Sequence, residues 1–230
     1  MTELRSALLA GSTGLVGREL AAQLTAAWPG PLHLLVRRDA KPASPAQRVH
    51  VVDFAALPPL PKADAAFCCL GTTIKAAGSQ QAFRAVDFDA VLAFARGAQR
   101  AGVKRFAVVS ALGAKATSSV FYNRVKGEME AELSRLGFAR LVIARPSLLA
   151  GDRAATGQPT RLGERLTLAL TAPLVPLIPL AWRPVQAAAV ARALRLALAQ
   201  DGPALQVLES AELQRLGKQL GAHQEKDTGR

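Results

Sequence analysis

Residues 7–17 read ALLAGSTGLVG, an apolar run followed by glycines at positions 11, 14 and 17. The apolar run is typical of a buried strand, and a helical pattern begins at Leu15. In such a strand–turn–helix the first glycine makes the tight turn, the second leaves room beside the backbone, and the third lets the helix pack closely. The helix N-terminus adds free N–H groups and a positive dipole end. The stretch predicts a pyrophosphate site formed by Gly11, Ser12, Thr13, Gly14, Leu15, Val16 and Gly17.

Short apolar runs alternate with longer helical patterns through the first two thirds of the chain. The predicted strands are Ala7–Ala10, Leu32–Val36, Val49–Val52, Ala65–Leu70, Phe106–Ser110 and Leu141–Ala144, and the predicted helices are Leu15–Ala27, Gln80–Ala101 and Val120–Leu136. The strands are apolar on both faces, as a parallel sheet covered by helices requires. The sequence therefore predicts an α/β fold, a Rossmann-like doubly wound parallel sheet with helices on both faces.

A different pattern follows Pro146. A polar stretch at 151–158 predicts a loop, and Arg161–Leu170, Val185–Ala199 and Ala211–Leu220 predict helices, with a last strand at Gln206–Leu208. We expect one domain over residues 1–223, in which residues 146–223 form a small substrate-side subdomain, and a polar tail at 224–230. The apolar segment 170–184 either walls a substrate pocket or forms an interface with a second copy or another protein. Prolines 173, 176 and 179 argue against a membrane span there.

The chain of 230 residues carries 29 Lys and Arg against 17 Asp and Glu, a net charge of +12. This excess suggests nucleic-acid binding, but no basic run exceeds two residues. We therefore expect no specific nucleic-acid partner, and assign most of the surplus to composition, spread over helix surfaces. The adjacent Cys68 and Cys69 fit a reducing, cytoplasmic setting and small core residues better than a redox or zinc motif. The three histidines lie far apart in sequence, so no metal site is expected.

Cations follow the second predicted strand. Arg37 and Arg38 stand where a cofactor without a 2′-phosphate usually meets an acidic residue, and an arginine suits that phosphate. The pattern favours NADP(H) over NAD(H). Asp53, before Phe54, follows the third strand and either accepts from an adenine amino group or caps a helix, two compatible roles. The loop Leu70-Gly71-Thr72-Thr73 follows the fourth strand and should border a ribose.

Tyr122 is the one tyrosine of the chain, and Lys126 lies four residues further on. On a helix these residues share a face. Ser110 ends the fifth strand, so the phenol, the ammonium and a hydroxyl could converge at one edge of the sheet. A nearby ammonium is expected to lower the pKa of Tyr122, which could then exchange a proton with a carbonyl oxygen held by Ser110. The alternative is an amphipathic helix whose Tyr and Lys are surface residues.

These motifs, together with Arg145-Pro146-Ser147, resemble the short-chain dehydrogenase/reductase superfamily in order and spacing. The glycine turn is similar to that of its extended and atypical branches. The segments CLGTTIK at 69–75, FRAVD at 83–87 and FYNRVKG at 121–127 resemble the branch related to the Tat-interacting metastasis suppressor. Bacterial members are described as nucleoside-diphosphate-sugar epimerases or NAD(P)-binding oxidoreductases.

The resemblance implies a role for each matching residue. Tyr122 would be the general acid and base, Lys126 its activator and a ribose ligand, and Ser110 would bind the substrate carbonyl. Arg37 would hold the 2′-phosphate, and Pro146 and Ser147 would border the nicotinamide. Asp87 departs from the pattern, because many extended members have Asn there, although Asp87 could still organise the backbone.

The sequence thus predicts an NADP(H)-binding oxidoreductase that acts on a carbonyl/alcohol pair of a small substrate. Two alternatives stay open. One is a regulatory, redox-sensing or scaffold protein that binds the nucleotide without turnover, and the other is an enzyme of the nucleoside-sugar epimerase/dehydratase type.

Overall fold

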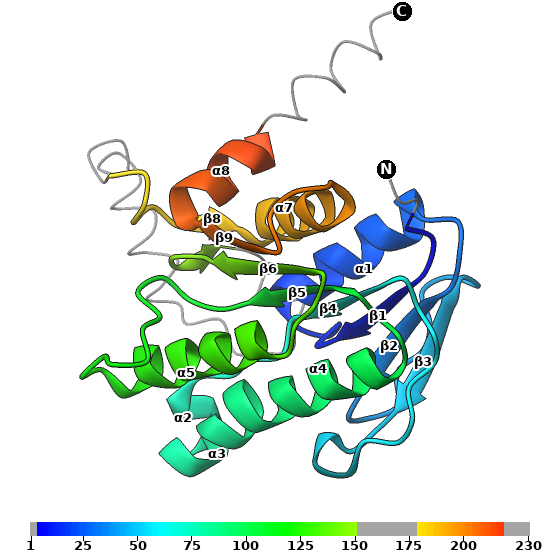
Figure 1. Ribbon diagram of the computed structural model, residues 1–230, viewed down its shortest axis with the longest axis horizontal. Coiled ribbons are helices and arrows are strands. Elements are labelled where there is room, and N and C mark those ends of the chain that lie inside the picture. Colours follow the sequence, from blue (N-terminus) through cyan, green and yellow to red (C-terminus); the bar gives the residue numbers. More distant parts are fainter. Residues whose placement is uncertain (1–3, 151–178, 219–230) are drawn as a thin grey trace, which may run out of the picture.

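The computed structural model describes residues 4–150 and 179–218 (Figure 1). Its main element is a parallel seven-stranded sheet in the order β3-β2-β1-β4-β5-β6-β9. The strands are β1 Ala7–Ala10, β2 Leu32–Val36, β3 Gln47–Val51, β4 Ala65–Cys68, β5 Arg105–Val109, β6 Arg140–Arg145 and β9 Leu205–Glu209. The order reverses direction beside β1, which is the doubly wound pattern, so the predicted fold class is confirmed.

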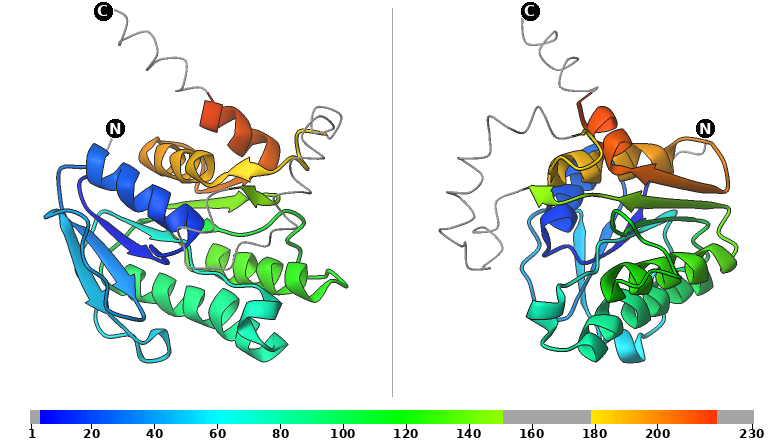
Figure 2. Two further views of the ribbon diagram at one scale, coloured as in Figure 1. Left: turned by 180° about the vertical axis from the view of Figure 1, so that it is seen from behind. Right: turned by 90° about the vertical axis from the view of Figure 1, so that its left-hand side faces the viewer.

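Helices cover both faces of the sheet. Helices α1 (Leu15–Ala27) and α7 (Ala187–Ala199) lie on one face, and α4 (Ala90–Arg100) and α5 (Phe121–Arg135) lie on the other (Figures 1 and 2). Neighbouring residues of β1 show why the strands are apolar throughout, since Leu9 packs into the core on the α1 side and Leu8 into the core on the α4 side. Both leucines have no exposed surface.

The predicted helix at 80–101 contains a π-helical turn. Helix α3 (Gln80–Arg84) runs into π-helical residues Ala85–Asp89, and α4 continues from Ala90. A short helix α2 (Ile74–Ala77), which the sequence pattern did not predict, precedes them. The π-helical turn includes Asp87, whose side chain is buried against α5.

The described C-terminal part adds β9 to the edge of the sheet beside β6. The predicted helix at 185–199 divides into a short strand β8 (Val185–Gln186), paired with β7 (Leu149–Ala150), and helix α7. Helix α8 is Ser210–Lys218. The expected loop at 151–158, the helix at 161–170, most of the 170–184 segment and the tail at 224–230 fall outside the described residues. No described helix combines the length and the apolar composition that crossing a membrane requires.

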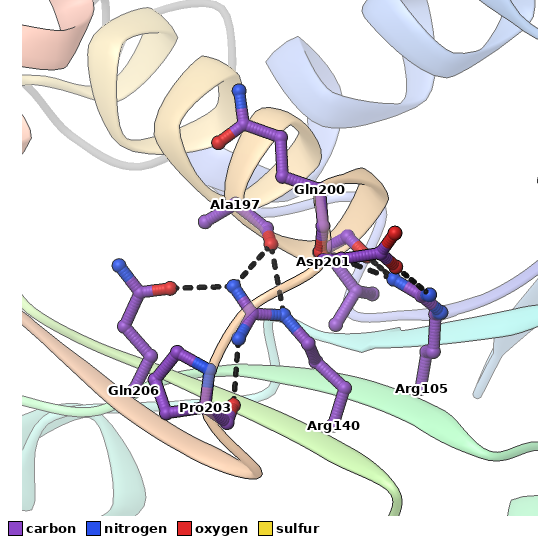
Figure 3. Close-up of polar contacts among 8 residues, drawn as sticks. Arg105, Arg140, Ala197, Gln200, Asp201, Pro203 and Gln206 are labelled. Carbon is purple, nitrogen blue, oxygen red and sulfur yellow. Dashed lines mark hydrogen bonds and ion pairs between the residues drawn. The ribbon is translucent and has the colours of Figure 1, made fainter. Parts of the chain in front are cut away.

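Several basic residues form part of the framework. Arg140, only 4% exposed, donates to the carbonyls of Ala197 and Pro203 and to the Gln206 side chain (Figure 3). Arg105 bonds the carbonyls of Leu198 and Gln200, and pairs with Asp201. These bonds hold the end of α7 to the sheet. The expectation that the basic surplus lies on helix surfaces is therefore wrong for these arginines.

Candidate functional site

The glycine turn joins β1 to α1 through close backbone contacts. Gly11 has φ +83°, and a Cβ there would lie 2.4 Å from the carbonyl carbon of Cys69. A Cβ on Gly17 would lie 2.1 Å from the Gly11 oxygen, so both positions require glycine. Gly14 differs, because its nearest neighbour would stand at 3.5 Å. Space at the middle glycine and tight packing at the outer two agree with the predicted roles.

The N-terminus of α1 leaves backbone donors available. Gly14 is the N-cap and supplies no side chain, and the first helical hydrogen bond runs from Arg18 N–H to Gly14 O at 3.0 Å. The amides of Leu15, Val16 and Gly17 precede that bond. Ser12 is buried and Thr13 is exposed. These donors at the positive end of a helix dipole fit a pyrophosphate group.

Arg37 and Arg38 follow β2 at the same edge of the sheet, and both side chains are exposed. Neither has an ion pair within the described ranges. Asp53 caps the 3-10 turn Phe54–Ala56 by accepting from Ala55 N–H at 2.9 Å, which confirms the capping alternative. The Phe54 ring is buried. The edge therefore offers two exposed guanidinium groups to an anion.

The loop Leu70–Thr73 lies between the glycine turn and α5. Cys69 N–H donates to Ala10 O at 2.8 Å, which holds the start of the loop to β1. Thr72 N–H donates to Asp87 Oδ2 at 2.8 Å, and Thr73 caps α2 through Ala76 N–H. Asp87 thus organises this backbone, as expected.

A buried ion pair lies next to this loop. Lys126 Nζ stands 2.8 Å from Asp87 Oδ1, and both residues are at most 3% exposed. Burial alone would lower the pKa of Lys126, but the Asp87 carboxylate and Tyr122 raise it. The ammonium therefore stays charged beside Asp87, and its N–H groups can serve further partners.

Tyr122 is half-buried one turn before Lys126, and its ring lies 5.3 Å from that of Phe83 on α3. Burial raises the pKa of Tyr122; Lys126 acts to lower it, and Asp87 acts to raise it. The expectation of a lowered pKa is therefore wrong. The physical reason is burial first, which disfavours the charged phenolate, and then the Asp87 carboxylate, which acts against the Lys126 charge.

Ser110 follows β5, with 4% of its surface exposed. Its N–H donates to Ala144 O at 2.7 Å, while its hydroxyl has no hydrogen-bond partner among the described residues. The loop that follows packs on α5, because Lys115 N–H donates to Asn123 O and a Cβ on Gly127 would meet Ala116 N at 2.2 Å. A buried hydroxyl without a partner is costly unless a ligand supplies one.

Pro146 and Ser147 follow β6 beside Ser110. Pro146 is buried, and its carbonyl accepts from Leu112 N–H at 2.8 Å. The Ser147 hydroxyl donates to Arg183 O at 2.5 Å and accepts from Ser210. The hydroxyl of Ser147 is thus engaged with the C-terminal elements rather than with Lys126 or Ser110.

A sequence model of a family described as NAD(P)H-binding matches residues 11–166, more than half of the chain. The match begins at the first glycine of the turn described above. This chain belongs to the NAD(P)H-binding family. The resemblance to Rossmann-type, atypical short-chain dehydrogenases is thereby confirmed.

Curated relatives of this NAD(P)H-binding protein include Protein FMP52-1, mitochondrial, of Scheffersomyces stipitis. The two are 30% identical over 164 residues, which are 64% of this chain and 69% of that protein. Protein HTATIP2 of Rattus norvegicus is 44% identical over 120 residues, 50% of this chain and 48% of that protein. The cytoplasmic location of this chain remains a prediction, and one of these relatives is named as a mitochondrial protein.

Solved structures with the same fold include nucleotide-sugar enzymes. Helicobacter pylori ADP-L-glycero-D-manno-heptose-6-epimerase has a TM-score of 0.67 at 17% identity, covering 95% of this chain and 83% of that chain. The Bordetella bronchiseptica enzyme WbmF, solved with NAD+, has a TM-score of 0.62 at 15% identity, covering 95% and 78%. At these identities the likeness shows the fold of the NAD(P)H-binding protein and not its substrate.

The sequence did not predict one buried ion pair, and it suggested the wrong environment for the carboxylate of Glu130. The Asp87–Lys126 pair was not predicted, although the position of Asp87 between the apolar Val86 and Phe88 was a signal for it. The sequence suggests a solvated helix face for Glu128, Glu130 and Glu132, but Glu130 is 6% exposed and bonds Arg145, which also pairs with Glu209. These two arrangements fix α5 to the π-helical turn on one side and to β6 on the other.

Proposed function

We propose that this NAD(P)H-binding protein is an NADP(H)-dependent oxidoreductase that interconverts the carbonyl and alcohol forms of a small substrate. The observation that carries the proposal is the buried, unpartnered hydroxyl of Ser110. Ser110 ends a strand at the same edge of the sheet as the glycine turn, and the loop after it packs on the helix that bears Tyr122 and Lys126. A carbonyl oxygen would satisfy that hydroxyl.

The residues present fit the cofactor of this family. The amides and space of residues 11–17 would hold the pyrophosphate, and Arg37, assisted by Arg38, would hold the 2′-phosphate. Asp53 and Phe54 would border the adenine, Leu70–Thr73 and Lys126 the ribose, and Pro146 and Ser147 the nicotinamide. When bound, NADP(H) would supply or accept the hydride of the reaction.

The chain's own residues would handle the proton. In the direction of reduction, the Ser110 hydroxyl donates a hydrogen bond to the carbonyl oxygen, and the Tyr122 phenol donates the proton that this oxygen gains. Burial keeps the pKa of Tyr122 above its ordinary value, so at neutral pH the phenol carries the proton it must give. In the reverse direction Tyr122 takes that proton back.

The test is NADPH oxidation against a panel of small aldehydes and ketones, read at the absorbance of the reduced cofactor. Tyr122→Phe keeps the ring against Phe83 but removes the acid. We expect turnover to fall by about 100-fold or more, since general acid catalysis contributes about that much, while NADPH affinity stays within about twofold. Turnover retained by Tyr122→Phe would exclude Tyr122 as the donor. Tight NADPH binding without turnover on any carbonyl would favour a regulatory protein.

A further inference from the structure

We propose that Asp87 is a positioning residue that holds the Lys126 ammonium in a neutral pair and so keeps Tyr122 in its protonated, proton-donating form. The inference deepens the proposed function and rests on it for its catalytic meaning. It states that the charges of Asp87 and Lys126 together set the pH at which the Tyr122 phenol ionises. That pH can be measured without a substrate.

Each carboxylate oxygen of Asp87 faces one group in the described structure. Oδ1 faces Lys126 Nζ at 2.8 Å, and Oδ2 accepts from Thr72 N–H at 2.8 Å. The side chain is 1% exposed, so water does not screen the pair. A Cβ on Gly71 would lie 3.4 Å from Oδ1 and 3.9 Å from Nζ, which shows how closely the backbone of the loop approaches both charges.

The π-helical turn gives Asp87 this position. Asp87 lies in the middle of residues 85–89, between α3 and α4, and the turn packs against α5. Phe83, two positions before the turn, contacts the rings of both Phe121 and Tyr122. The exposed flank carries its own ion pair, Arg84 with Glu128. The helical segment that positions Asp87 therefore also contacts Tyr122. In other proteins, π-helical turns are frequent at functional sites.

Two charged groups act on Tyr122, and they have opposite signs. Lys126 from its own helix favours the phenolate, and Asp87 from the π-helical turn favours the phenol. From α3, the packed neighbour is the uncharged ring of Phe83. The buried Cys68 of β4 faces Lys126, and burial raises the pKa of its thiol to about 12, so it brings no charge at neutral pH. Because Asp87 offsets Lys126, burial decides the protonation of Tyr122.

One tyrosine in the whole chain makes the experiment specific. Phenolate formation raises the ultraviolet absorbance near 295 nm, and Tyr122 is the only tyrosine of the chain that can form a phenolate. Spectra recorded immediately after pH jumps read the native protein before alkaline unfolding. We compare wild type with Asp87→Asn, and with Asp89→Asn as the matched control, because Asp89 lies on the same turn but is exposed.

We expect the wild-type phenol to ionise above the ordinary value of about 10. Asp87→Asn should lower the midpoint of phenol ionisation by about one pH unit or more, because the Lys126 charge then acts on the phenol without a neighbouring carboxylate. Asp89→Asn should leave it unchanged. Asp87→Glu, which keeps the carboxylate, should restore part of the wild-type value. An unchanged or higher midpoint in folded Asp87→Asn would overturn the proposal.

A second variant removes the other partner of the pair and gives an independent reading. Lys126→Gln removes the ammonium and leaves the carboxylate, so the phenol midpoint should rise further. A fall would contradict the proposal even if Asp87→Asn does not fold. Once a substrate is known, the alkaline limb of kcat for reduction should move to lower pH in Asp87→Asn, with KM for NADPH changed little. A shifted phenol midpoint in a protein without turnover would support the coupling and reject the oxidoreductase, so the two failures are distinguishable.

Discussion

Asp87 Oδ1 lies 2.8 Å from Lys126 Nζ, and the two side chains are 1% and 4% exposed. A buried pair of this kind is costly to break on one side, because the remaining charge is left without either water or a partner. The pair joins the π-helical turn to α5 and brings the loop after β4 with it through Thr72. The stability of the fold and the electrostatics of the site therefore depend on the same contact.

Breaking the pair on one side should destabilise the protein strongly. Lys126→Met should lower the free energy of unfolding by about 3–5 kcal/mol, because Asp87 is then buried uncompensated. Replacing both residues, as in Asp87→Leu with Lys126→Met, should recover at least half of that loss. Urea unfolding followed by tryptophan fluorescence measures both. The matched control is Arg135→Met, whose ion pair with Glu132 is exposed and should matter by less than about 1 kcal/mol. Equal stability of Lys126→Met and wild type would disprove the account of the pair.

The three glycines of the turn should respond differently to alanine. At Gly14 the added Cβ meets nothing closer than 3.5 Å and φ is −81°, so Gly14→Ala should fold with nearly wild-type stability. The same methyl group occupies the space assigned to the pyrophosphate, so NADPH affinity should fall about tenfold or more, which is about 1.4 kcal/mol.

Gly11→Ala provides the contrast, because its Cβ would lie 2.4 Å from the Cys69 backbone at a positive φ. That variant should lose stability first. Thermal unfolding and NADPH fluorescence titration, run on both variants, separate the two effects. Undiminished NADPH affinity in folded Gly14→Ala would place the pyrophosphate elsewhere.

The adjacent cysteines should be chemically quiet in the native state. Burial raises the pKa of the buried Cys68 to about 12, and burial together with the neighbouring Cys68 also raises the pKa of the partly buried Cys69. A raised pKa means that the thiol, and not the thiolate, is present at pH 8, and the thiolate is the reactive form. We expect no reaction with a thiol reagent at pH 8 until urea unfolds the chain, when both residues react. Rapid labelling of the native protein would contradict this.

The sequence predicted the N-terminal half of the fold closely. Ala7–Ala10, Leu15–Ala27 and Leu32–Val36 have the same boundaries in the structure as in the prediction. In this half the hydrophobic pattern is strong, and glycines or prolines stand next to the element ends, so local signals and tertiary packing agree. The edge strand β3 is less buried, and its start was misplaced by two residues because Gln47 and Arg48 do not look like strand residues.

The features that were missed depend on contacts between distant residues. A single π-helical turn of five residues is too short to show a periodicity of its own, so residues 85–89 gave no separate signal. Glu130 looks like a surface residue until Arg145 is seen beside it. The direction of the pKa of Tyr122 could not be predicted from the spacing of Tyr122 and Lys126. Burial outweighs the Lys126 charge, and Asp87, 35 positions earlier in the chain than Tyr122, acts in the same direction as burial.

The central claim is that this chain binds NADP(H) through the glycine turn, with the 2′-phosphate on Arg37. Fluorescence titration of wild type and Arg37→Ala with NADPH and with NADH tests it most directly, and Arg100→Ala, exposed at the end of α4, controls for general charge. Hydrogen bonds to charged groups contribute about 1.5–3 kcal/mol, so Arg37→Ala should weaken NADPH binding about 10- to 150-fold and leave NADH binding nearly unchanged. A ratio of the two affinities that is the same in wild type and Arg37→Ala would contradict the assignment.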